Sequence, residues 1–263
     1  MLIFLKLGGS LITDKDQAHT ARVNIIHRLA DEIKESIKNN SELSLLLGHG
    51  SGSFGHMPAK KYDTRNGVST ALQWQGFLEV WKEAHGLHQI LLEIFSEHNL
   101  PVISFPPSAM VIAKNKTVEK WDIGPIESAL SANLIPVVFG DVVFDLEIGA
   151  TIFSTEELFL PLADHLKPQK IFIAGIEEGV WQDYPSCQRL VKVITHDSGI
   201  LNTKEVGPSR SIDVTGGMLE KVILMRQLTL KHSQMTANIF SGLIPHNLTR
   251  CLKGEELGTT IRF

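Results

Sequence analysis

Short apolar runs of strand character alternate with longer amphipathic patterns along most of this chain. The runs at residues 2–7, 43–48 and 101–105 each end in, or lead into, glycine or proline. Helical patterns over residues 21–38 and 70–98 lie between them. Because parallel strands need long crossovers, this alternation is typical of a mostly parallel sheet that helices cover on both faces.

The same alternation continues in the second half of the chain. Further strands are expected at 134–139, 170–175, 237–240 and 259–261, a hairpin segment at 145–152, and helices near 125–133, 154–166 and 217–232. Residues 182–212 are polar and irregular. We therefore expect a three-layer αβα sandwich on one continuous sheet, with an N-terminal lobe at 1–166 and a C-terminal lobe at 167–263.

Composition narrows the classes of partner. The chain has 263 residues, 43% of them apolar, and a formal net charge of −4, which argues against general nucleic-acid binding. No apolar run reaches the roughly 18 residues of a membrane span, and the N-terminus has the character of a first strand rather than a signal peptide. Two cysteines, Cys187 and Cys251, are too few for a disulfide framework or a zinc site. We expect a cytoplasmic protein with no nucleic-acid or membrane partner and no metal ligands of its own.

The loop after the second strand has the composition of a phosphate site. Residues 48–55 include glycine at four of eight positions and end beside His56. Glycine lets a ligand approach the backbone, and successive unobstructed N–H groups form an anion site. We expect this loop to hold phosphate, with His56 as a titratable group at its rim.

Two common nucleotide motifs do not explain this loop. Gly50 to Gly55 matches G-x-G-x-x-G, but a dinucleotide fold needs an acidic residue after the next strand. The nearest candidate, Glu79, lies inside a helical pattern instead. The chain also has no G-x-x-x-x-G-K-[ST], so it is not a P-loop protein.

Three glycine turns each have a cationic side chain nearby. In α/β sheets ligands bind outside the carboxyl ends of the strands, so the three turns are expected to converge on one polyphosphate. A single lysine beside a turn is usually a solvated surface charge. Three lysines that each lie near a glycine turn instead favour a polyphosphate-binding site. The turns are at 8–9, 48–55 and 216–217, and the lysines are Lys6, Lys15 and Lys221.

At these residues the sequence resembles the amino acid kinase family, and most of all its isopentenyl phosphate kinase branch. The resemblance spans nearly the whole chain. It implies an open αβα sandwich, usually a homodimer, that uses ATP with Mg²⁺ to phosphorylate a small isoprenoid monophosphate. The matching segments are Lys6 to Ser10, Thr13 to Lys15, Gly50 to His56, Gly140 to Val143 with Asp145 and Gly149, Asp213 to Met218 with Lys221, and Gly258 with Thr259.

The resemblance and the phosphate chemistry together assign roles to single residues. The expected catalytic residues are Lys6, Lys15, His56 and Lys221. The expected ATP-binding residues are Lys6, Gly8, Gly9, Ser10, Gly52, Glu178, Gly217 and Lys221. The expected acceptor-binding residues are Ser51, Gly52, His56 and Thr155, and Glu156 is expected to orient the lysines.

Two segments depart from the family pattern. Ser154 to Glu157 stands where the family usually has Ser-Gly-Asp-Asp, so Glu156 would act with one extra methylene. Ile176 to Val180 stands where the family has Asp-Val-Asp-Gly-Val, on the side where the resemblance implies contacts to adenine or ribose.

The organic tail of the acceptor is expected to be short and apolar. The helical pattern at 70–98 has more apolar residues than one stripe needs, which indicates core packing or a pocket for this tail. In the second interpretation Gly76 and Gly86 make room. Two other functions stay open: a kinase of the same fold that acts on the phosphonate fosfomycin, and a non-catalytic binder of nucleotides or oxyanions.

Overall fold

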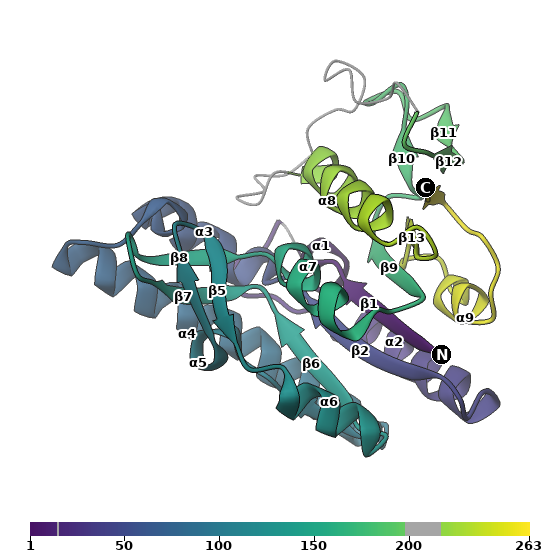
Figure 1. The fold of residues 1–263 in the computed structure, drawn as a ribbon, viewed down its shortest axis with the longest axis horizontal. Coiled ribbons are helices and arrows are strands. Elements are labelled where there is room, and N and C mark those ends of the chain that lie inside the picture. Colours follow the sequence, from purple (N-terminus) through teal and green to yellow (C-terminus); the bar gives the residue numbers. More distant parts are fainter. Residues whose placement is uncertain (15, 198–216) are drawn as a thin grey trace.

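An eight-stranded sheet runs through the middle of the protein (Figure 1). The computed structural model describes residues 1–14, 16–197 and 217–263. From β13 to β3 all neighbours are parallel, whereas β14 is antiparallel to β13. The spatial order is β12 (Val193–Ile194), β14 (Thr259–Ile261), β13 (Thr236–Ser241), β9 (Lys170–Gly175), β1 (Leu2–Leu7), β2 (Ser44–His49), β6 (Ile135–Phe139) and β3 (Val102–Ser104).

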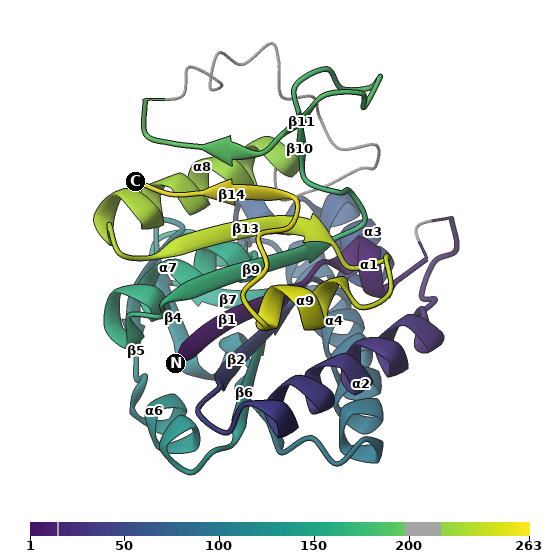
Figure 2. The same cartoon turned by 90° about the vertical axis from the view of Figure 1, so that its right-hand side faces the viewer.

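Helices cover both faces of this sheet (Figures 1 and 2). The core on one face is formed with α1 (Gly9–Ile12), α2 (Val23–Asn39), α4 (Ala71–Glu97) and α9 (Asn247–Leu252). The core on the other face is formed with α6 (Gly124–Ser131), α7 (Thr155–Leu166) and α8 (Gly217–Lys231). The three-layer αβα sandwich with a mostly parallel sheet, expected from the sequence, is therefore confirmed.

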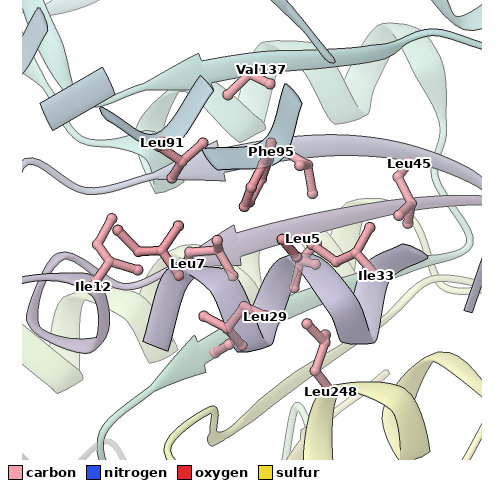
Figure 3. Packing of buried hydrophobic residues seen from close by; sticks show 14 of the residues in the cluster. Leu5, Leu7, Ile12, Leu29, Ile33, Leu45, Leu91, Phe95, Val137 and Leu248 are labelled. Carbon is pink, nitrogen blue, oxygen red and sulfur yellow. The ribbon is translucent and has the colours of Figure 1, made fainter. Parts of the chain in front are cut away.

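Alternation along β1 decides which way its side chains point. Leu5 and Leu7 pack into the core beneath α2 and α4, where Figure 3 shows them near Phe95. Phe4 points to the other face, and its ring centroid lies 5.1 Å from that of Phe159 on α7. Since successive residues of a strand face opposite sides, Lys6 shares the side of Phe4 and is directed toward α7 and α8.

Two of the predicted helices begin with complete capping boxes. The hydroxyl of Thr70 accepts the Gln73 N–H, and the Gln73 side chain accepts the Thr70 N–H, at the start of α4. Ser154 and Glu157 make the same reciprocal pair at the start of α7. Each pair satisfies N–H groups that have no partner within the helix, which fixes where the helix begins.

A second sheet of four strands lies beside the first; its β7–β8 hairpin matches the hairpin segment expected near 145–152, whereas β4 and β5 were not expected. Its order is β5 (Thr117–Trp121), β4 (Val111–Lys114), β7 (Asp141–Asp145) and β8 (Gly149–Phe153). The carboxylate of Asp145 accepts N–H groups from Asn115 and Lys116 in one turn and from Glu147 and Ile148 in the other. Asp145 therefore joins the β4–β5 and β7–β8 turns.

The remaining elements are short, apart from α3 (Gly52–Tyr62), which follows the glycine loop. The others are η1 (Thr64–Asn66), α5 (Pro107–Met110), β10 (Val180–Trp181) and β11 (Leu190–Val191). The predicted irregular region at 182–212 contains β11 and β12, and its part from residue 198 lies outside the described residues. No helix in the described ranges is both long and apolar enough to cross a bilayer.

Candidate active site

The ends of three neighbouring parallel strands bring the first two glycine turns to one edge of the sheet. The Gly8 N–H, just after β1, donates to the Ala174 carbonyl at the end of β9 over 2.8 Å. The Gly50 N–H, just after β2, donates to the Leu7 carbonyl over 3.1 Å. This edge is the carboxyl end of the strands, where ligands bind in open α/β sheets.

The two glycine turns touch each other through their main chains. A Cβ atom at Gly9 would lie 2.5 Å from the Gly52 nitrogen, and Gly52 itself has a φ of +51°. Side chains at either position would force the turns apart. Thr13 secures the contact, since its hydroxyl donates to the Gly9 carbonyl over 2.7 Å and accepts the Ser53 N–H over 3.0 Å.

Several main-chain N–H groups at this contact are available to a ligand. In the part of the chain that the structure describes, no acceptor is found for the N–H groups of Gly9, Ser10, Ser51 and Gly52. They belong to the first turns of α1 and α3 or to the residue just before α3. Such N–H groups attract anions, and phosphate in particular.

Lys6 and Glu156 form a buried ion pair beside these turns. The Lys6 ammonium contacts Glu156 Oε2, and the two residues are 5% and 2% exposed. Burial favours the neutral form of Glu156, but the charges of Lys6 and then Lys221 hold the pKa of its carboxyl below the usual value. Lys221, on the second turn of α8, therefore acts on the same carboxylate from the neighbouring helix. Glu156 Oε1 is buried and has no hydrogen-bond partner among the described residues.

The structure thus brings together five of the expected groups: Lys6, Glu156, Lys221 and the two glycine turns. Lys221 Nζ also lies 3.4 Å from the Gly217 carbonyl at the start of α8, where Gly217 has a φ of +69°. This contact holds the Lys221 ammonium near the first turn of α8. Lys15 and Gly216 lie outside the described residues, so their predicted places are not described here.

The other expected site residues are buried to different degrees. His56 lies one helical turn beyond Gly52 on α3 and is half-buried. The Thr155 hydroxyl is fully buried and donates to the His49 carbonyl over 2.6 Å, so it holds the end of β2. Glu178 is exposed in the turn between β9 and β10. The roles assigned to these three residues stay predictions.

The expectation that two glycines of α4 make room for the acceptor tail is wrong. A Cβ at Gly76 would lie 2.3 Å from Tyr62 Cβ, so this glycine lets α3 pack closely on α4. Gly86 is exposed and has nothing within 4 Å of its added Cβ. Gly76 therefore serves the packing of α3 on α4, and Gly86 lies on the exposed side of that helix.

Arg65 lies beside the charged cluster, although no pattern in the sequence pointed to it. Its guanidinium makes two hydrogen bonds with Glu157 on α7, of 2.9 and 3.2 Å, and lies 3.8 Å from Glu220 on α8. These glutamates are the neighbours of Glu156 and Lys221 in the chain. Arg65 therefore connects the two helices that carry the charged cluster, through partners too distant in sequence for a local pattern to reveal.

A family model and individual relatives of known name agree on the kind of protein to which this chain is similar. The sequence model of the amino acid kinase family matches residues 1–241. The isopentenyl phosphate kinase of Methanocaldococcus jannaschii is 33% identical over 274 residues, which cover 100% of this chain and 99% of that protein. The isopentenyl phosphate kinase of Methanothermobacter thermautotrophicus is 30% identical over 269 residues, covering 99% and 98% respectively.

Solved structures agree with these sequence relatives. A structure of isopentenyl phosphate kinase superposes with a TM-score of 0.83 at 29% identity and covers 99% of this chain and 100% of its own. Aspartate kinase from Synechocystis gives a TM-score of 0.66 at 16% identity over 40% of its length, a likeness of fold alone.

Proposed function

Because this chain belongs to the amino acid kinase family, we propose that it transfers the γ-phosphoryl group of ATP directly to the phosphate of isopentenyl phosphate. The observation that carries the proposal is the buried Lys6–Glu156 pair, with Lys221 acting on the same carboxylate, beside two touching glycine turns. Full-length similarity to the Methanocaldococcus jannaschii enzyme supports the choice of acceptor.

Phosphoryl transfer asks for positioning and charge neutralisation more than for covalent help. Lys6 and Lys221 would neutralise charge on the ATP phosphates and on the transferring group. The N–H groups of Gly9, Ser10 and Gly52 would hydrogen-bond phosphate oxygens. Glu156 would keep both lysines aimed at the phosphates rather than at bulk water.

The acceptor needs no general base. A phosphate monoester, with a second pKa of about 6, is already largely a dianion at neutral pH. We propose that His56 hydrogen-bonds the acceptor phosphate and that Lys15 bridges toward the transferring group. Ser51 and Gly52 would bind the acceptor with main-chain N–H groups.

Magnesium would enter together with the nucleotide. Among residues 1–14, 16–197 and 217–263, no group of three or more His, Cys, Asp or Glu side chains is placed to hold a metal ion. Mg²⁺ keeps most of its water and binds substrate phosphates readily, so ATP itself would supply its ligands. When bound, it would neutralise phosphate charge.

We propose that the two lobes of the chain bind different substrates. Residues 1–166 would bind the acceptor and supply part of the active site, while residues 167–263 would bind the nucleotide, with Glu178 and Gly217 on that side. We further propose a cytoplasmic homodimer. Exposed apolar side chains on α4 and the adjoining β7, such as Leu78, Trp81 and Phe144, support an association surface.

An ADP-release assay across small acceptors tests the proposal. Isopentenyl phosphate, fosfomycin and a blank without acceptor are compared at the same ATP concentration, with ³¹P NMR of the product. ADP release that depends on isopentenyl phosphate, with a diphosphate product, is expected. Preference for fosfomycin would identify a phosphonate kinase, and nucleotide binding without turnover would identify a binder.

Variants with a matched control locate the chemistry. Lys221→Met is expected to lower kcat by about 10²–10³-fold, because a cation that stabilises the transferring group is lost. Lys231→Met on the same helix, where the ammonium is exposed and pairs with Asp164, should leave kcat unchanged. His56→Asn should lower kcat/KM for the acceptor while ATP binding stays nearly normal, and near-normal turnover would remove His56 from the mechanism.

A further inference from the structure

A chain of hydrogen bonds leads from the glycine loop into the core beneath α4. His49 Nδ1 lies 3.2 Å from the Gly50 carbonyl, and His49 Nε2 lies 2.9 Å from His88 Nδ1. His88 Nε2 lies 2.6 Å from the Ser104 hydroxyl at the end of β3. His49 and His88 are only 1% and 4% exposed, so this chain runs through the interior.

The carbonyl at one end fixes the direction of every bond in the chain. A carbonyl oxygen only accepts, so His49 Nδ1 must carry a hydrogen and, in a neutral ring, His49 Nε2 must accept. His88 Nδ1 therefore donates to His49, and His88 Nε2 accepts the Ser104 hydroxyl. One arrangement satisfies all three bonds, with both imidazoles neutral and protonated at Nδ1.

The surroundings keep both rings neutral. Burial lowers the pKa of His49 to about 4 and that of His88 to about 2. The charges that face His49 act in the same direction: Lys6 on β1 and His85 on α4 both disfavour a second positive charge. On the far side of His85, the Asp141 carboxylate on β7 lies 3.2 Å from His85 Nε2.

Phe139 limits rotation of the two rings. Its centroid lies 4.1 Å from that of His88, with 20° between the planes, and 5.2 Å from that of His49, with 4° between the planes. The imidazoles are thus held in stacked planes, and the hydrogen bond to Gly50 has a fixed direction.

The direction of the Gly50 carbonyl determines that of the next N–H. The Gly50–Ser51 peptide is trans, so the Ser51 N–H points opposite to the Gly50 carbonyl. The carbonyl faces the imidazole of His49, and the Ser51 N–H therefore faces away from it and has no acceptor among the described residues. The Lys6 side chain passes close to this peptide, with its Cε 3.9 Å from an added Cβ at Gly50.

We propose that His49, His88 and Ser104 are positioning residues that hold the Gly50–Ser51 peptide so that the Ser51 N–H faces the bound phosphate. The proposal rests on the proposed function, because it takes a phosphate as the ligand of that N–H. Without the chain, the peptide between two glycine-rich segments could rotate, and its carbonyl oxygen would then repel the phosphate.

Two substitutions at His49 separate positioning from simple packing. In asparagine the amide nitrogen occupies about the place of Nδ1, so His49→Asn keeps the donor to Gly50. In glutamine the amide nitrogen lies near Nε2, so His49→Gln loses that donor. We expect His49→Gln to lower kcat/KM for the acceptor at least about tenfold and His49→Asn less than threefold. Equal losses in the two variants would overturn the proposal.

His27→Gln is the matched control. His27 Nδ1 lies 2.8 Å from His98 Nε2, between α2 and the end of α4, so this variant also breaks a hydrogen bond between two histidines, away from the glycine loop. Its kcat/KM should stay within twofold of the wild type. A tenfold loss of kcat/KM in His27→Gln would show that breaking any such hydrogen bond lowers activity through stability alone. That result would refute a positioning role for His49.

The protonation sites of His49 and His88 can be measured by NMR, which tests the hydrogen-bond chain without an activity assay. Long-range ¹H–¹⁵N spectra of histidine-labelled protein at pH 7.5 should show His49 and His88 neutral with hydrogen on Nδ1. Hydrogen on Nε2 of His49 would overturn the proposal. If the wild type phosphorylates no acceptor, the proposed function fails, while these spectra still decide the hydrogen-bond chain.

Discussion

Replacing Lys6 with methionine should leave the Glu156 carboxylate buried without its ion-pair partner. Methionine keeps the length of the aliphatic stem, so most of the packing survives and the change is mainly electrostatic. The side chains of Lys6 and Glu156 are 6% and 3% exposed, so water can screen little of the lost attraction. Of the two charges that lower the pKa of Glu156, only that of Lys221 remains.

The magnitude follows from this burial. Removing one partner of a buried pair costs about 3–5 kcal/mol of unfolding free energy, and the remaining Lys221 places the expected loss near the lower end, about 3 kcal/mol at pH 8. In the wild type the depressed pKa of Glu156 adds stability above pH 4.5 that is lost as the pH falls through the folded-state value. In Lys6→Met burial instead raises that pKa, so the loss should shrink as the pH approaches 4 and the carboxyl is protonated.

Urea denaturation of the wild type and of Lys6→Met at pH 8 and pH 4.5 measures the loss of unfolding free energy and how that loss changes with pH. The double variant Lys6→Met with Glu156→Met should regain most of the stability, because apolar side chains of similar length often replace a buried pair at little cost. Neither variant should transfer phosphate. A single variant that loses less than about 1 kcal/mol at pH 8, or the same amount at both pH values, would refute the buried pair as described.

Two further predictions concern stability. Lowering the pH from 6.5 to 4 should reduce the free energy of unfolding by about 3 kcal/mol through His49 alone, because the unfolded chain takes up the proton first. His88 should reduce it further in the same way. A urea midpoint that stays constant over this range would contradict both depressed pKa values. Gly76→Ala should cost about 1–3 kcal/mol through its clash with Tyr62. Gly86→Ala, exposed on the same helix, should gain up to about 1 kcal/mol, and thermal melts that rank the two alanine variants in the opposite order would contradict the packing described.

Features with a local cause were accessible from the sequence. The alternation in β1 and the two capping boxes depend on neighbours within a few residues, so strand, face and helix start follow from the pattern. The glycines at 8–9 and 48–55 were predicted to be ligand turns from their local composition, and that role stays a prediction. Their direct contact was not, since it depends on the packing of β1 against β2.

Features that depend on distant partners were missed. The strands β4 and β5 are short and their exposed positions are polar, so nothing in their sequence separates them from a loop. The one-turn helix α1 occupies what the pattern suggested was only a tight turn. His49 was visible at the end of a buried strand, but its role depends on His88 and Ser104, which arrive from other elements.

The contacts of Arg65 have a consequence for how α7 and α8 can separate. It holds Glu157 with two short bonds but Glu220 only across 3.8 Å. If nucleotide exchange separates α8 from α7, the longer contact is the one that gives way. The segment from α3 to η1 would then travel with α7 as one body, and Lys221 would withdraw while Lys6 and Glu156 stay together.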